Sequence, residues 1–151
     1  MEPVDVSVAQ DGGILKTTIK TAPEGAVATG GSLITIHVLY YTSDGTKLYS
    51  TRDGAGEPDQ DAVGEPVQHI IGQGYQIRGW EEGIPTMKIG ERAKFVIRGD
   101  YNVSDDDSDC YGFRNPDVIH DIELIKREKI SSEVRSSLQN ILVIFSMLTS
   151  V

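Results

Sequence analysis

The only tryptophan of the chain, Trp80, lies between Gly79 and Gly83. Apolar residues recur around it at helical spacing, which predicts a short helix with one buried face, formed by Ile77, Trp80, Ile84 and Met87. Each glycine disfavours a helix by up to about 1 kcal/mol, and Pro85 disfavours it further, so packing must hold this helix. A lone tryptophan on such a face is most often a core residue.

Three other features could do chemistry: a pair of histidines, an acidic run and the single cysteine. None of them has the spacing or the neighbours that its chemistry would need. His69 and His120 fall on the inner faces of predicted strands, but two histidines and a distant Cys110 do not form a metal site, so polar core residues are the better interpretation. The acidic run at 105–109 lacks the glycine and the terminal glutamate of a calcium loop, which indicates a solvated loop. The same carboxylates disfavour the thiolate of Cys110, so no reactive thiol is predicted. We therefore predict neither a metal nor a cofactor.

Length, charge and cysteine content narrow the class of protein. The chain has 151 residues, enough for one domain, and a formal net charge of −9. That charge argues against nucleic acid and anionic membrane surfaces, because phosphate binding needs clustered lysine and arginine. A single cysteine excludes an internal disulfide, and the N-terminal residues resemble no secretory signal, so a cytoplasmic or nuclear location is expected.

The stretches around the Trp80 helix predict an antiparallel sheet. Alternating apolar residues predict six strand segments, in the ranges 13–20, 32–42, 46–52, 67–71, 92–98 and 118–126, which are expected to form a sheet of about five strands. Ser43, Asp44 and Gly45 predict a hairpin turn. Because only one helix occurs among the strands, the fold class is predicted as α+β, a five-stranded antiparallel sheet wrapped on one short helix.

The two ends of the chain differ from this central domain, which we place at residues 13–129. Residues 1–12 are acidic and without pattern, and are predicted as a loose lead-in. Residues 130–151 have apolar residues at helical spacing and predict a C-terminal helical extension. Its apolar run is too short for a membrane span, which needs about 20 residues. The extension is expected to dock on the sheet, to bind a partner chain, or to be a truncated linker.

The order of motifs resembles the FKBP family of peptidyl-prolyl cis-trans isomerases, over about residues 13–128. The strongest match is IRGWEEG at 77–83, followed by Met87 and by GERAK at 90–94. His37, the Asp44–Gly45 turn, STRD at 50–53 and DIEL at 121–124 occur in the family's order. The resemblance implies the same fold of five antiparallel strands on one helix.

The resemblance also implies which residues form the site. Trp80 corresponds to the floor of the family's pocket, and the backbone N–H of Ile77 to the donor that faces a ligand carbonyl. At the other pocket positions this chain departs from the family, with Val38, Leu48, Tyr49, Val67, Gln76, Val103 and His120 in place of the usual residues, and most of the aromatic wall is lost. Tyr40, Tyr49 and Tyr111 are the candidates to rebuild that wall.

Two functions follow from the resemblance. The first is a peptidyl-prolyl isomerase of reduced activity, which acts on X–Pro bonds of client proteins by desolvating the twisted amide in an apolar pocket and binds macrolide inhibitors weakly. The alternative is a non-catalytic interaction module of the same fold, which binds a partner through its acidic loops and C-terminal helix. The first is the favoured prediction, because the residues of the floor and of its supporting turn are kept, and the second remains the alternative.

Overall fold

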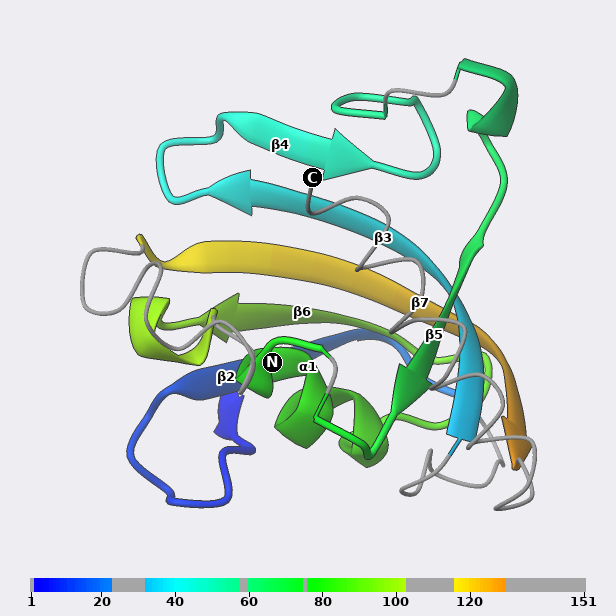
Figure 1. The fold of residues 1–151 in the computed structure, drawn as a ribbon. Helices are drawn as coiled ribbons and strands as arrows, with labels where there is room; N and C mark the ends of the chain where they lie inside the picture. Colours follow the sequence, from blue (N-terminus) through cyan, green and yellow to red (C-terminus); the bar gives the residue numbers. More distant parts are fainter. Residues whose placement is uncertain (1, 23–31, 58–59, 75, 103–115, 130–151) are drawn as a thin grey trace, which may run out of the picture.

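The computed structural model describes residues 2–22, 32–57, 60–74, 76–102 and 116–129. Figure 1 shows its elements, which are in chain order β1 (Val4–Asp5), β2 (Ile14–Lys20), β3 (Ser32–Thr42), β4 (Lys47–Ser50), η1 (Gln60–Ala62), β5 (Val67–Ile71), α1 (Arg78–Gly83), η2 (Ile84–Thr86), β6 (Arg92–Ile97), η3 (Gly99–Tyr101) and β7 (Val118–Lys129). The predicted C-terminal helix lies outside the described residues.

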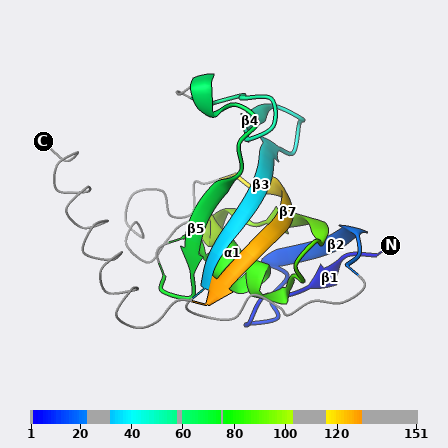
Figure 2. The ribbon, with the colours of Figure 1, turned by 90° about the vertical axis from the view of Figure 1, so that its right-hand side faces the viewer.

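The strands form one antiparallel sheet in the order β1-β2-β6-β7-β3-β4, and β5 also pairs with β3. The sheet curves around the single described α-helix (Figure 2), so the α+β class is confirmed. The structure has seven strands among the described residues. Six of them, β2 to β7, lie at the predicted ranges, and β4 and β5 share one edge of β3. The seventh, β1, is a two-residue strand paired with β2 that was not predicted. The hairpin between β3 and β4 turns at Gly45, whose φ of 89° suits glycine.

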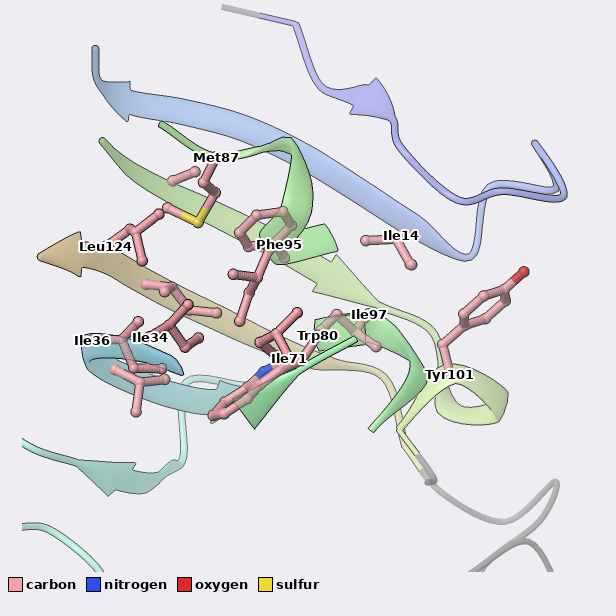
Figure 3. Packing of buried hydrophobic residues seen from close by; sticks show 14 residues of the cluster. Ile14, Ile34, Ile36, Ile71, Trp80, Met87, Phe95, Ile97, Tyr101 and Leu124 are labelled. Atoms are coloured by element: carbon pink, nitrogen blue, oxygen red, sulfur yellow. The ribbon is translucent and has the colours of Figure 1, made fainter. Parts of the chain in front are cut away.

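Helix α1 is held by packing, as its poor propensity required. The side chains of Trp80 in α1, and of Ile84 and Met87 just after it, are buried. They pack with side chains of β2, β3, β6 and β7 in one core (Figure 3). Pro85 lies in the first turn of the 3₁₀ segment η2, after α1 has ended, so it removes no hydrogen bond from the α-helix. The prediction of a helix rescued by burial is therefore confirmed.

Gly79 lets α1 approach the sheet closely. A Cβ at this position would lie 2.6 Å from the side chain of Ile97, whereas a Cβ at Gly83 would lie 3.1 Å from the ring of Phe95. The first distance is far below van der Waals contact, so the glycine permits an approach that alanine would prevent. The same approach brings Trp80, the next residue, down onto the sheet.

Gly79→Ala is expected to lower the free energy of unfolding by about 1–2 kcal/mol, because overpacking against Ile97 outweighs a helix-propensity gain of about 1 kcal/mol. Gly83→Ala makes the same propensity change with a milder contact and serves as the control, with an expected effect within about 1 kcal/mol. Urea unfolding followed by tryptophan fluorescence measures both. Stabilisation by Gly79→Ala would contradict the close approach.

The lead-in is tied to the sheet at two places. Val4 and Asp5 pair with Lys16 and Leu15 as β1, and the carboxylate of Asp11 accepts hydrogen bonds from the Tyr101 hydroxyl at 3.0 Å. A two-residue strand is too short to show a period, so the sequence pattern gave no sign of it. The domain boundary at residue 13 stays a prediction.

Candidate active site

One apolar cavity opens between α1 and the strands β3, β4, β5 and β7. Its volume is about 780 Å³, and it is lined by Val38, Tyr40, Leu48, Tyr49, Val67, His69, Gln76, Ile77, Trp80, Asn102, Pro116, Val118 and His120. All the described residues that the sequence predicted for the site therefore meet in one place. Val103 and Tyr111, which were also predicted, lie outside the described residues.

Trp80 lies at the base of this cavity, in the middle of α1. Its side chain is 7% exposed, and its indole N–H donates to Nδ1 of His120 at 2.9 Å. The imidazoles of His69 and His120 approach the indole edge-on, with ring centroids 5.3 and 5.8 Å away. The ring is thus fixed by helix, histidines and core together.

The wall of the cavity is rebuilt by Tyr40, Tyr49 and His120, which we call the aromatic wall. Tyr40 of β3 lies directly opposite Tyr49 on β4 and opposite His120 on β7. Directly opposed side chains on one face of a sheet lie within contact distance, and here the rings stack at 5.3 and 5.1 Å. The strand register therefore supplies an aromatic surface where the family's usual residues are absent.

The segment before α1 is held by Glu81. Its carboxylate accepts hydrogen bonds from the backbone N–H of Gly72 at 2.7 Å and of Gln76 at 3.1 Å. The carbonyl of Ile77 accepts from Trp80 N–H and Glu81 N–H, which starts the helix. Gln76 and Ile77, which line the cavity, are thereby fixed immediately before Trp80.

The ionisable groups of the cavity are kept neutral. Burial lowers the pKa of His120 to about 3, and burial also lowers the pKa of His69. Burial, aided by the hydrogen bond from its hydroxyl to Glu57 at 2.9 Å, raises the pKa of Tyr49 to about 12. Near neutral pH the cavity surface carries no charge from these three side chains.

Sequence reasoning assigned no site role to four of the lining residues: His69, Asn102, Pro116 and Val118. Val118 could have been found, because it precedes His120 by two positions on the same strand face. His69 was identified only as a core histidine. Asn102 and Pro116 flank the acidic loop, where no periodic pattern indicates the direction of a side chain.

The chemistry available in this cavity is binding and desolvation. Among the described residues, no three His, Cys, Asp or Glu side chains gather to hold a metal ion. The described part of the chain contains no helix long and apolar enough to span a membrane. A neutral, mostly apolar cavity with an aromatic floor suits a compact apolar ring joined to a polar amide.

Comparison with known proteins gives one consistent family. The family model described as FKBP-type peptidyl-prolyl cis-trans isomerase matches residues 25–125. "FK506-binding protein 1" of Yarrowia lipolytica is 35% identical over 95 residues, which cover 63% of this chain and 80% of that protein. "Peptidyl-prolyl cis-trans isomerase Fkbp12" of Drosophila melanogaster is 35% identical over 106 residues, covering 65% and 82%.

A third relative extends the match. "Peptidyl-prolyl cis-trans isomerase" of Schizosaccharomyces pombe is 31% identical over 121 residues, which cover 75% of this chain and 93% of that protein. Two of these three relatives carry the isomerase activity in their names. The names favour an enzyme over the non-catalytic module that the sequence left open.

Proposed function

The chain belongs to the family of FKBP-type peptidyl-prolyl cis-trans isomerases, and we propose that it isomerises X–Pro bonds in the cavity above Trp80. The observation that carries the site assignment is the rebuilt aromatic wall. Tyr40, Tyr49 and His120 stack beside the tryptophan floor, although the residues at most of the family's wall positions have changed.

The reaction needs no nucleophile and no proton transfer. The barrier to rotation about a peptide bond is about 18–20 kcal/mol, and an uncatalysed X–Pro bond takes tens of seconds or more to isomerise. Rotation breaks the resonance of the amide, so the twisted form is less polar than either planar form. A site that removes water from the amide therefore lowers the barrier, and the neutral cavity supplies that environment.

Six of the predicted site residues have specific roles in this proposal. The proline ring packs on the indole of Trp80, and the backbone N–H of Ile77 donates to the carbonyl of the bound peptide. Val38, Leu48 and Val67 give apolar contact around the ring. Gln76, which also lines the cavity, is assigned to contact with the residues that flank the proline.

The substrates that this surface supports are exposed proline-containing segments of proteins. Macrolide ligands are expected to bind more weakly than they bind to family members with the usual wall, because Val38 and Leu48 offer less surface than aromatic rings. The single cysteine is in keeping with a cytoplasmic or nuclear place of action. The predicted binding of a partner by residues 130–151 stays a prediction, since that segment lies outside the described residues.

The test of the activity is NMR exchange spectroscopy on a short peptide with one X–Pro bond, which measures interconversion of the two isomers directly. We expect the purified chain to accelerate exchange in proportion to its concentration, with a kcat/KM below that of relatives with the usual aromatic wall. A macrolide titration in the same sample should suppress the acceleration. Exchange at the uncatalysed rate, even at high protein concentration, would contradict the proposal.

A further inference from the structure

A chain of three side chains runs from the floor of the cavity to the backbone behind it. The indole N–H of Trp80 donates to Nδ1 of His120 at 2.9 Å, and this bond is buried. The other ring nitrogen of His120, Nε2, lies 3.3 Å from Oδ1 of Asn102. The amide nitrogen of Asn102 donates to the carbonyl oxygens of Ile97 at 2.9 Å and Pro116 at 3.2 Å.

The direction of these hydrogen bonds follows from the groups at the two ends. An indole N–H is only a donor, so Nδ1 of His120 must present its lone pair. The carbonyl oxygens of Ile97 and Pro116 are only acceptors, so the NH₂ of Asn102 must face them and its oxygen must face His120. His120 is therefore neutral, with its proton on Nε2, and every member donates in one consistent direction.

We propose that His120 and Asn102 are positioning residues of the isomerase site, which hold the indole of Trp80 in one orientation through this directed chain. The inference rests on the function proposed above. Tyr40, stacked on the imidazole at 5.1 Å, holds the plane of His120 as well. The indole cannot tilt without leaving a donor and an acceptor unpaired inside a buried site, which is costly.

The hydrogen bond to His120 also determines which part of Trp80 a substrate can contact. Because the indole N–H is already used by His120, Trp80 presents only apolar ring surface to a proline. A phenylalanine at position 120 would pack beside Tyr40 but would free the indole N–H and leave the ring held by packing alone. The polar residue at this position thus substitutes hydrogen bonding for part of the missing aromatic contact.

The hydrogen bond can be observed directly in the unmodified chain. Trp80 is the only tryptophan, so ¹⁵N labelling gives one indole N–H signal. We expect a nitrogen–nitrogen coupling across the hydrogen bond between Trp80 Nε1 and His120 Nδ1, together with the ¹⁵N shifts of an imidazole protonated on Nε2. Absence of the coupling, or a proton on Nδ1, would overturn the proposal whatever the activity of the protein.

His120→Phe tests the effect on catalysis. We expect kcat to fall about fivefold while KM changes less than twofold, because a floor of fixed orientation matters most when the amide is twisted. His37→Phe, the same substitution outside the cavity, is the control and should leave both constants unchanged. A rise in KM with an unchanged kcat would show His120 to be a simple contact residue and would overturn its positioning role.

Asn102 is tested by a matched pair of variants. Asn102→Leu and Asn102→Asp both lose the NH₂ that donates to Ile97 and Pro116, but only the aspartate keeps an oxygen for His120. We expect the coupling and most of the kcat to persist in Asn102→Asp at mildly alkaline pH and to decline in Asn102→Leu. Equal loss in both would overturn the role of Asn102 in this chain. A silent isomerisation assay with the coupling intact would instead count against the proposed function.

Discussion

Trp80→Ala is expected to abolish measurable isomerase activity and to lower the free energy of unfolding by about 3–5 kcal/mol. The indole is 7% exposed and packs within the core that joins α1 to the sheet. Its removal leaves a void at the base of the cavity and leaves Nδ1 of His120 without its donor. The proline ring would then meet water in place of an apolar floor, and the environment that favours the twisted amide is lost.

Stability and activity must be separated in this experiment. Leu124→Ala removes a fully buried side chain of the same core at a position that does not line the cavity, and it should cost about 2–5 kcal/mol. We expect Leu124→Ala to keep its activity at temperatures where it is folded, and Trp80→Ala to show none. Exchange spectroscopy measures the activity, and urea unfolding followed by circular dichroism measures the stability. Catalysis by folded Trp80→Ala would place the isomerase site elsewhere.

The fold could be predicted from the sequence because its signals are local. Strand alternation in β3, β6 and β7 has a period of two, and the face formed by Trp80, Ile84 and Met87 has a helical period. Each pattern is complete within a dozen residues. The strand that was not predicted is β1, which has only two residues and therefore shows no period.

The residues of the site could be predicted from motif positions, but not the contacts that they make with one another. Trp80 and Ile77 were identified from a single motif, and both line the cavity. The aromatic wall depends on the register that places Tyr40 opposite both Tyr49 and His120, and His120 is 80 positions further along the chain. Alternation predicts which face a side chain occupies but not which strand lies beside it.

The hydrogen-bond chain behind Trp80 was beyond prediction for a similar reason. Asn102 follows the 3₁₀ turn η3, where the backbone has no period that would orient its amide. Its partners are Ile97 at the end of β6 and Pro116 just before β7. Those two strand ends are adjacent only because β6 and β7 pair, so the contact is a property of the assembled sheet.

Lowering the pH is expected to lower the free energy of unfolding already at pH values well above those at which the carboxyl groups titrate. Burial lowers the pKa of His120 from 6.5 to about 3, so the folded state keeps this ring neutral while the unfolded state takes up a proton below about pH 6.5. The unfolded state then binds more protons, and the free energy of unfolding falls as the pH is lowered. This loss begins near pH 6.5 and ends near pH 3, with about 2 kcal/mol already lost between pH 7 and pH 5.

The carboxyl groups act in a lower window, which lets the two effects be told apart. The Thr42 hydroxyl and Thr46 N–H lower the pKa of Asp44 from 3.8 to about 2, so its contribution is lost only below about pH 4. Urea unfolding at several values between pH 7 and pH 5 therefore reports the histidines. His120→Phe should flatten that slope by the largest amount, because His120 is buried. His37→Phe should flatten it by less: burial and the nearby Arg52 also lower the pKa of His37, but that side chain is only half-buried.

The slope, and not the stability at one pH, is the decisive quantity. His120→Phe also leaves the indole N–H of Trp80 without its acceptor, which lowers stability at every pH by a similar amount. Only the loss of a group that is neutral when folded and charged when unfolded changes how stability varies with pH. An unchanged slope in His120→Phe would mean that His120 is protonated as easily in the folded chain as in the unfolded one. The lone pair that accepts from Trp80 would then not be kept free, and the orientation of the floor would have to rest on packing alone.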